Sequence, residues 1–141
     1  MKHIMVATDG SEGAIRAVDT AARLARAVGG DLVILHVEGE GNVLHDAERL
    51  VPQIAGDVLD THARRILSVA RDQALAAGVS GVRTEAAWGD AADVIIDRAG
   101  RNQLDAVVVG RRGRGRLSGL LLGSVSQKVA CLATCLVLIV P

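Results

Sequence analysis

Glycine, serine and arginine residues crowd the segment from residue 110 to residue 126, where they could bind phosphate groups. Gly110, Gly113 and Gly123 let the backbone approach a ligand closely. Ser124 would open a helix whose free N–H groups attract anions, and Ser124 and Ser126 can both donate a hydroxyl proton to phosphate oxygens. Four positive charges lie in the same loop: Arg111, Arg112, Arg114 and Arg116. By spacing alone, the segment suits a polyphosphate site and a solvated arginine loop equally well.

Two common nucleotide motifs do not account for this segment. A Walker A loop needs a lysine directly after its second glycine, and Lys128 follows no glycine. A dinucleotide fingerprint needs three spaced glycines after the first strand, where Gly10 stands alone.

Apolar runs alternate with helical stretches along the chain, and this order predicts the fold that would position the segment. We expect strands at 4–7, 32–37, 82–87, 105–109 and 135–140. We expect helices at 12–28, 53–77, 91–99 and 124–133, the first capped by Ser11 and the third by Asp90, with a loop at 38–52. Apolar periodicity gives the first helix a face of Ile15, Val18, Ala22, Ala25 and Val28, and gives the second a side with Ile54, Val58, His62, Ile66, Val69 and Ala70. Several strands are apolar throughout, which is typical of a parallel, doubly wound α/β sheet covered on both faces. Ligands bind at the carboxyl ends of such strands, where strand order reverses. With the first and fourth strands central, that place is Thr8-Asp9-Gly10 and Gly110.

Length and composition limit the classes of protein to which this chain can belong. The chain has 141 residues, no visible repeat or linker, and we expect one domain spanning 1–141. Sixteen acidic and sixteen basic residues cancel, which argues against a nucleic-acid binder. No apolar run reaches membrane-spanning length, and the N-terminus does not resemble a signal peptide. We interpret Cys131 and Cys135 as small, buried, hydrophobic residues that remain reduced, so we expect a cytoplasmic protein.

Other polar or aromatic residues have structural interpretations beside functional ones. Asp9 could contact a ligand or merely cap the first helix. We expect His36 to be a core or strand-end residue, and His45 and His62 show no metal-ligand spacing. Trp88, the only aromatic residue, could plug an apolar edge of the sheet. No residue is predicted to be catalytic.

Six segments together resemble the ATP-binding universal stress proteins. The signature is Gly110, two residues, Gly113, nine residues, then Gly123-Ser124. The flanking matches are 4–11, 35–37, 89–92, 120–126 and 135–140. Ala91 and Leu136 stand where the family usually has proline.

This resemblance implies a five-stranded flavodoxin-like, adenine nucleotide α-hydrolase-like sheet of order 3-2-1-4-5, and a site for ATP with Mg²⁺ or Mn²⁺. Gly110 and Gly113 would lie against ribose and phosphates, and Asp9 beside the ribose or the metal. Ala7 and Val37 would frame the adenine. The phosphates would be held by Gly123, Ser124, Val125 and Ser126. Thr8 and Arg112 complete the predicted site.

The resemblance also implies a homodimer formed through the last strand, Leu136–Val140. We interpret the protein as a nucleotide-dependent switch, in which ATP orders the loop 111–122 and so changes a surface that an unknown protein partner reads. One alternative is a slow ATPase or autophosphorylating protein, with Asp9 holding metal and Ser124 or Ser126 accepting phosphate. Another is a binder of cyclic AMP or a different adenine nucleotide. We expect no membrane or nucleic-acid partner.

Overall fold

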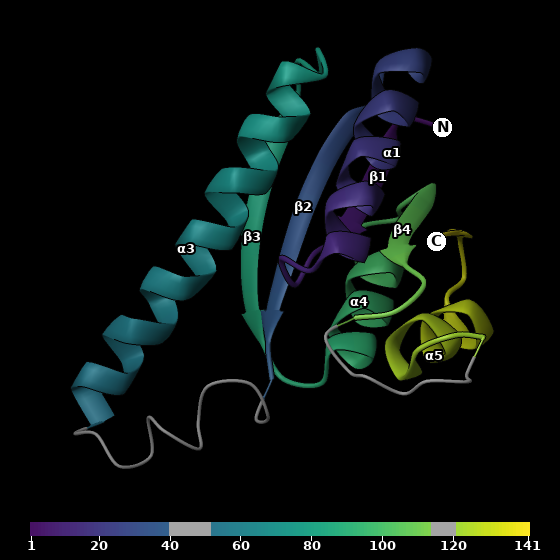
Figure 1. Ribbon diagram of the computed structural model, residues 1–141. Helices are drawn as coiled ribbons and strands as arrows, with labels where there is room; N and C mark the ends of the chain where they lie inside the picture. Colours follow the sequence, from purple (N-terminus) through teal and green to yellow (C-terminus); the bar gives the residue numbers. More distant parts are fainter. Residues whose placement is uncertain (40–51, 114–120) are drawn as a thin grey trace.

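Five parallel strands form one sheet in the order β3-β2-β1-β4-β5 (Figure 1). The computed structural model describes residues 1–39, 52–113 and 121–141, and only the backbone of 52–60. The strands are β1 (His3–Ala7), β2 (Asp31–Glu38), β3 (Val82–Trp88), β4 (Ala106–Gly110) and β5 (Leu136–Val140). The helices are α1 (Glu12–Val28), α3 (Pro52–Ala76), α4 (Ala91–Arg101) and α5 (Ser124–Leu132). The predicted fold class, strand order and central β1–β4 pair are confirmed.

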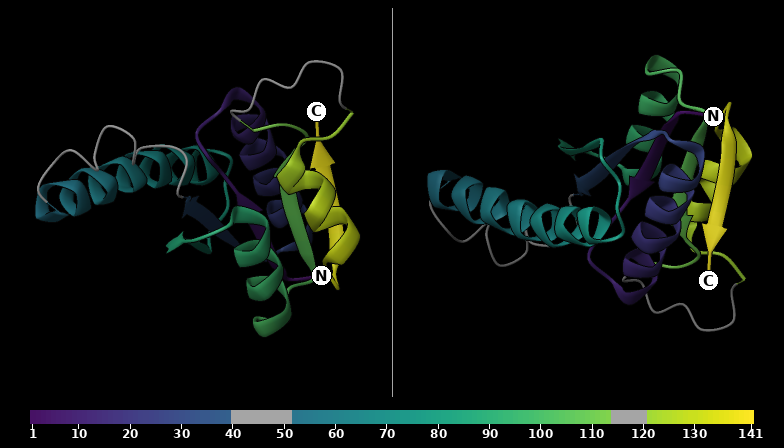
Figure 2. Two further views of the ribbon diagram at one scale, coloured as in Figure 1. Left: turned by 90° about the horizontal axis from the view of Figure 1, so that it is seen from below. Right: turned by 90° about the horizontal axis from the view of Figure 1, so that it is seen from above.

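Helices cover both faces of the sheet, as the continuously apolar strands require (Figure 2). Ile4 and Val6 of β1 pack in the cluster that includes buried residues of α1 and α3. Met5, on the opposite face, packs in the cluster that includes α4 and α5. The cores are aliphatic, so the sheet is sandwiched between two layers of small and branched side chains.

Expectations about six individual side chains are wrong. Ile15 and Val28 are exposed, although they were expected on the apolar face of α1. That face is made by Val18, Ala22 and Ala25, as expected, together with Ala14, Ala17 and Ala21. Val69 of α3 is exposed as well. Cys131 is exposed and Cys135 half-buried, and Trp88, 58% exposed, plugs no edge. Alanines leave a helix's inner face ambiguous in sequence, because they suit either side.

The loop expected at 38–52 is shorter at both ends. Glu38 is the last residue of β2, where it pairs with Trp88, and Pro52 opens α3. Most of the remaining loop lies outside the described residues.

Asp90 caps α4, as predicted, and its stabilising effect should depend on pH. Its carboxylate accepts a hydrogen bond from the Asp93 N–H at 2.9 Å. This bond, together with Lys128, holds the pKa of Asp90 below its ordinary value of 3.8. We expect Asp90→Ala to cost about 1 kcal/mol of unfolding free energy near neutral pH.

The direction of this pH dependence follows from the linkage between proton binding and folding. Because the folded pKa is lowered, the contribution of the carboxylate is complete above pH 3.8 and is lost as the pH falls through the folded value. Urea unfolding at neutral and strongly acidic pH measures this, with Asp90→Asn, which keeps an acceptor oxygen, as control. An equal loss for Asp90→Ala at both pH values would contradict the prediction.

Candidate functional site

A pocket of about 290 Å³ opens at the carboxyl ends of β1 and β4, at the place that the sheet topology predicts. All eleven residues of the predicted site line it: Ala7, Thr8, Asp9, Val37, Gly110, Arg112, Gly113, Gly123, Ser124, Val125 and Ser126. Leu35, Ile95, Val109 and Leu122 are among its further lining residues, which sequence reasoning missed. The lining therefore combines apolar side chains, which suit a planar aromatic base, with polar groups, which suit the charged part of a ligand.

A side chain at either of two glycines of this pocket would meet close neighbours. A Cβ on Gly110 would lie 3.1 Å from the carbonyl carbon of Gly13, where the end of β4 meets the start of α1. A Cβ on Gly113 would lie 2.9 Å from the Oδ2 atom of Asp9. A side chain at residue 113 would therefore press against the carboxylate of Asp9, a group of the kind that contacts a bound cation or a ribose hydroxyl.

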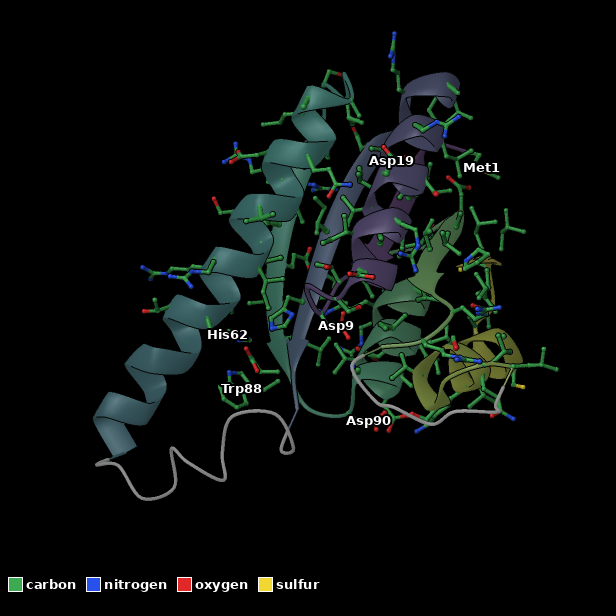
Figure 3. The ribbon with its side chains drawn as sticks, viewed as in Figure 1. Met1, Asp9, Asp19, His62, Trp88 and Asp90 are labelled. Carbon is green, nitrogen blue, oxygen red and sulfur yellow. The ribbon has the colours of Figure 1, made fainter. Side chains whose placement is uncertain are left out.

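Asp9 lies in the turn between β1 and α1 (Figure 3). Its Oδ1 atom accepts a hydrogen bond from the Ser11 N–H at 2.9 Å. The cap of α1 is Ser11, whose hydroxyl oxygen accepts from the Ala14 N–H at 3.3 Å. The capping role considered for Asp9 therefore belongs to Ser11, and the Oδ2 atom of Asp9 faces Gly113.

The N-terminus of α5 also faces the pocket, through Ser124 and Val125. Gly123 occupies the N-cap position in an extended conformation, and no side chain of the described residues caps the helix there. The first N–H groups of α5 and the positive end of its dipole are available to an anion in the pocket.

Backbone hydrogen bonds tie the two ends of the arginine-rich loop together. The Gly123 N–H donates to the Arg111 carbonyl at 2.9 Å, and the Arg111 N–H donates to the Val140 carbonyl at 2.6 Å. The buried Ser126 hydroxyl lies 2.8 Å from the Arg111 carbonyl and 3.0 Å from that of Gly123. Ser126 therefore holds the loop in this structure, and donation from its hydroxyl to a phosphate stays a prediction. Arg111 and Arg112 are exposed, and Arg114 and Arg116 lie outside the described residues.

A second polar cluster, beside the pocket, was not predicted. His36, Glu38 and His62 bring one nitrogen, one oxygen and one nitrogen within 4.8 Å of one another. His36 is 4% exposed, as expected for a core residue, and Glu38 is equally buried. Figure 3 places His62, on α3, near the ends of β2 and β3. Positions 36 and 38 share one face of a strand, which was a usable signal, but nothing local in the sequence brings residue 62 to them.

Two histidines decide the charge state of Glu38. Burial by itself opposes ionisation of its carboxyl group, but hydrogen bonds from His62 and His36, and their charges, hold its pKa below the ordinary value of 4.5. The Oε1 atom of Glu38 lies 2.9 Å from His36 Nε2 and 2.8 Å from His62 Nδ1. The cluster thus holds a buried carboxylate between two imidazoles.

The described parts of the chain contain no helix that is both long and apolar enough to cross a bilayer.

Comparison with known proteins agrees with this fold. The profile of the universal stress protein family matches residues 1–141. Universal stress protein YxiE of Bacillus subtilis is 35% identical, and the alignment covers 97% of each chain. A universal stress protein crystallised in complex with cAMP is 32% identical, with a TM-score of 0.74 over 99% of this chain and 95% of that one. UspA of Lactobacillus plantarum superimposes with a TM-score of 0.84 over 99% and 97% of the two chains at 22% identity, which bears on the fold alone.

Proposed function

Because the chain belongs to the universal stress protein family, we propose that its pocket binds an adenine nucleotide, with ATP as the ligand. The observation that carries the proposal is the convergence of all eleven predicted residues, from four separate parts of the chain, on one pocket. A bound nucleotide would place its base against Ala7 and Val37 and its phosphates against the start of α5. The relative in complex with cAMP supports an adenine ligand.

The same relative favours a second candidate, in which the physiological ligand is cyclic AMP. The two ligands differ in their tails. ATP carries a long, strongly charged polyphosphate, which needs the helix N-terminus and a cation, whereas cyclic AMP carries one phosphate closed on its own ribose. Direct calorimetric titration with each nucleotide, and competition between them, decides which one binds more tightly. Failure of both to bind would overturn the proposal.

Asp9 would hold the Mg²⁺ or Mn²⁺ that accompanies ATP, because it lines the pocket and carboxylate oxygens are preferred ligands of such cations. We expect Mg²⁺ to strengthen ATP binding about tenfold, about 1.4 kcal/mol, and Asp9→Asn to abolish that gain. Asparagine keeps an oxygen for the Ser11 N–H, so the turn should remain folded. Titrations in magnesium and in EDTA measure the effect, with cyclic AMP as a ligand that needs no metal. A variant that responds to magnesium like the wild type would contradict the assignment.

As a switch, the protein would transmit nucleotide occupancy through the loop 111–122 to a protein partner. The hydrogen bonds that join Arg111 to Gly123 and to Val140 give such a change a route to the edge of the sheet. Residues 114–120 of this loop lie outside the described residues. We place the protein in the cytoplasm, where its two free cysteines would stay reduced.

We also propose that two copies pair through β5. This strand is an edge of the sheet, and it is apolar throughout, with Leu136 52% exposed. An unpaired apolar edge invites a strand from another chain. Because the N–H of Leu136 and the carbonyl of Val140 bond toward β4 and its extension, alternation places the polar backbone groups of Val137 and Ile139 on the open side.

Ile139→Pro should therefore convert a dimer into a monomer without unfolding it. Proline removes the outward N–H of residue 139 and leaves the hydrogen bonds to β4 in place. Sedimentation at micromolar concentration is expected to show a dimer for the wild type and a monomer for the variant, with unchanged circular dichroism. A wild-type protein that is already monomeric there would refute the pairing.

A further inference from the structure

His36, Glu38 and His62 offer the donor set of a transition-metal site, although nothing in their spacing along the chain suggests one. The two imidazole nitrogens flank a single carboxylate oxygen, Oε1 of Glu38, at 2.9 and 2.8 Å. His36 and Glu38 are fixed on the rigid strand β2, and His62 reaches them from α3. The side chain of His62 is 30% exposed, so the cluster has one side open to solvent.

The hydrogen bond made by Nδ1 of His36 determines what the Nε2 atom of the same ring can contact. Its Nδ1 atom is 2.8 Å from the main-chain carbonyl of Thr8, which can only accept a hydrogen bond. Nδ1 therefore carries a proton, and a neutral His36 presents the lone pair of Nε2 to Glu38. Two lone pairs that face each other at 2.9 Å need a cation between them, either a proton or a metal ion.

The same arrangement is the one that metal-binding histidines use. A ligating imidazole commonly donates its other N–H to a backbone carbonyl, which fixes both the tautomer and the ring orientation. We propose that His36 Nε2, Glu38 Oε1 and His62 Nδ1 bind a divalent transition-metal ion, of which Zn²⁺ fits best. Two imidazoles and one carboxylate form a recurrent zinc ligand set, which leaves a position for water or another ligand.

The distances are close to those of a loaded site. Bonds of about 2.1 Å to a metal space neighbouring donor atoms about 3.0 Å apart at right angles and about 3.4 Å apart in a tetrahedron. The two histidine-to-Glu38 distances need to widen by only a few tenths of an ångström. The two imidazole nitrogens lie within 4.8 Å of each other, and the partly exposed His62 can supply any movement that a metal ion requires.

This site is separate from the Asp9 position proposed for magnesium, and its ligands differ in kind. Nitrogen donors select zinc-like cations over magnesium, which prefers oxygen. The site nevertheless adjoins the nucleotide pocket, because Thr8, which orients His36, lines that pocket. Zinc binding does not depend on nucleotide binding, so the two proposals can fail independently.

The test is zinc titration of the metal-free protein, without nucleotide, by competition with a chromogenic chelator and by the visible spectrum of the cobalt form. We expect one equivalent of zinc to bind near neutral pH and to raise the melting temperature. His62→Gln should weaken binding at least tenfold, because glutamine can still donate a hydrogen bond to Glu38 but is a poor zinc ligand. His3→Gln and His45→Gln, the histidines outside the cluster, serve as matched controls and should bind zinc like the wild type.

Three results would overturn the proposal. They are the absence of stoichiometric zinc binding by the wild type, unchanged zinc affinity in His62→Gln, and loss of the bound zinc equivalent in either control variant. The melting temperature of His62→Gln in EDTA shows whether the variant is folded. If it is not, His62→Asn and the cobalt spectrum decide, since a bound imidazole alters the ligand-field bands and a surface-bound ion does not.

Discussion

Valine in place of Gly113 or Gly123 should weaken ATP binding at least tenfold, or about 1.4 kcal/mol, with little loss of stability. At residue 113 the new side chain would enter the space in front of Asp9, whose Oδ2 atom lies 2.9 Å from a Cβ there. At residue 123 it would occupy the approach to the N-terminus of α5. The backbone of Gly123 has φ −73°, which any residue can adopt, so the loss should come from the occupied pocket.

Gly100→Val is the matched control for both variants. Gly100 lies in α4, and a Cβ there meets nothing within 4 Å. Gly110 is less suitable for this purpose, because its Cβ would press against the backbone of Gly13 and affect folding. Calorimetry with ATP, together with urea unfolding, separates affinity from stability. Unchanged affinity in both pocket variants would mean that the phosphates bind elsewhere.

Glu38→Ala should cost about 3 kcal/mol of unfolding free energy in metal-free buffer, because it removes the shared partner of two histidines from a buried site. His36 and His62 would each lose a hydrogen bond of less than 3 Å. Water can replace Glu38 at the partly exposed His62, which is why we expect the lower end of the range for broken buried pairs.

Glu85→Ala is the control variant for this loss of unfolding free energy. Glu85 lies on β3, and its carboxylate is 3.4 Å from the Arg98 guanidinium, with about a third of each side chain exposed. Such exposed pairs contribute about 0.2–1 kcal/mol. Urea unfolding of both variants in EDTA measures the contrast. Equal losses of unfolding free energy would show that the buried interactions of Glu38 stabilise the protein no more than an exposed ion pair does.

The sheet and the pocket could be predicted because their signals are local. Continuous apolar runs such as 106–109 identify strands buried on both faces, and Gly123-Ser124 marks a helix start directly in the sequence. The first and fourth strands were then expected to be central, which located the site at Thr8-Asp9-Gly10 and Gly110. Individual site residues such as Ala7 and Val37 came from the resemblance to the family, because spacing alone suited a solvated loop equally well.

The His36–Glu38–His62 cluster could not be predicted, because it depends on how α3 is rotated and shifted against β2. His62 was expected on the apolar side of α3 with Ile66, but so was Val69, which is exposed, and that side alone does not show which strand residues His62 meets. In α1 the alanines obscured the inner face, and Ile15 was misplaced for that reason. Packing against the sheet, rather than hydrophobicity along one helix, fixes these rotations.

The short hydrogen bond from the Arg111 N–H to the Val140 carbonyl joins the loop at which we expect phosphates to bind to the strand at which we expect two copies to meet. Sites linked in this way exert equal influence in both directions. If a nucleotide tightens self-association by a given factor, the assembled form must hold the nucleotide more firmly by that same factor. Cellular abundance of the protein would then help to set how much nucleotide it retains.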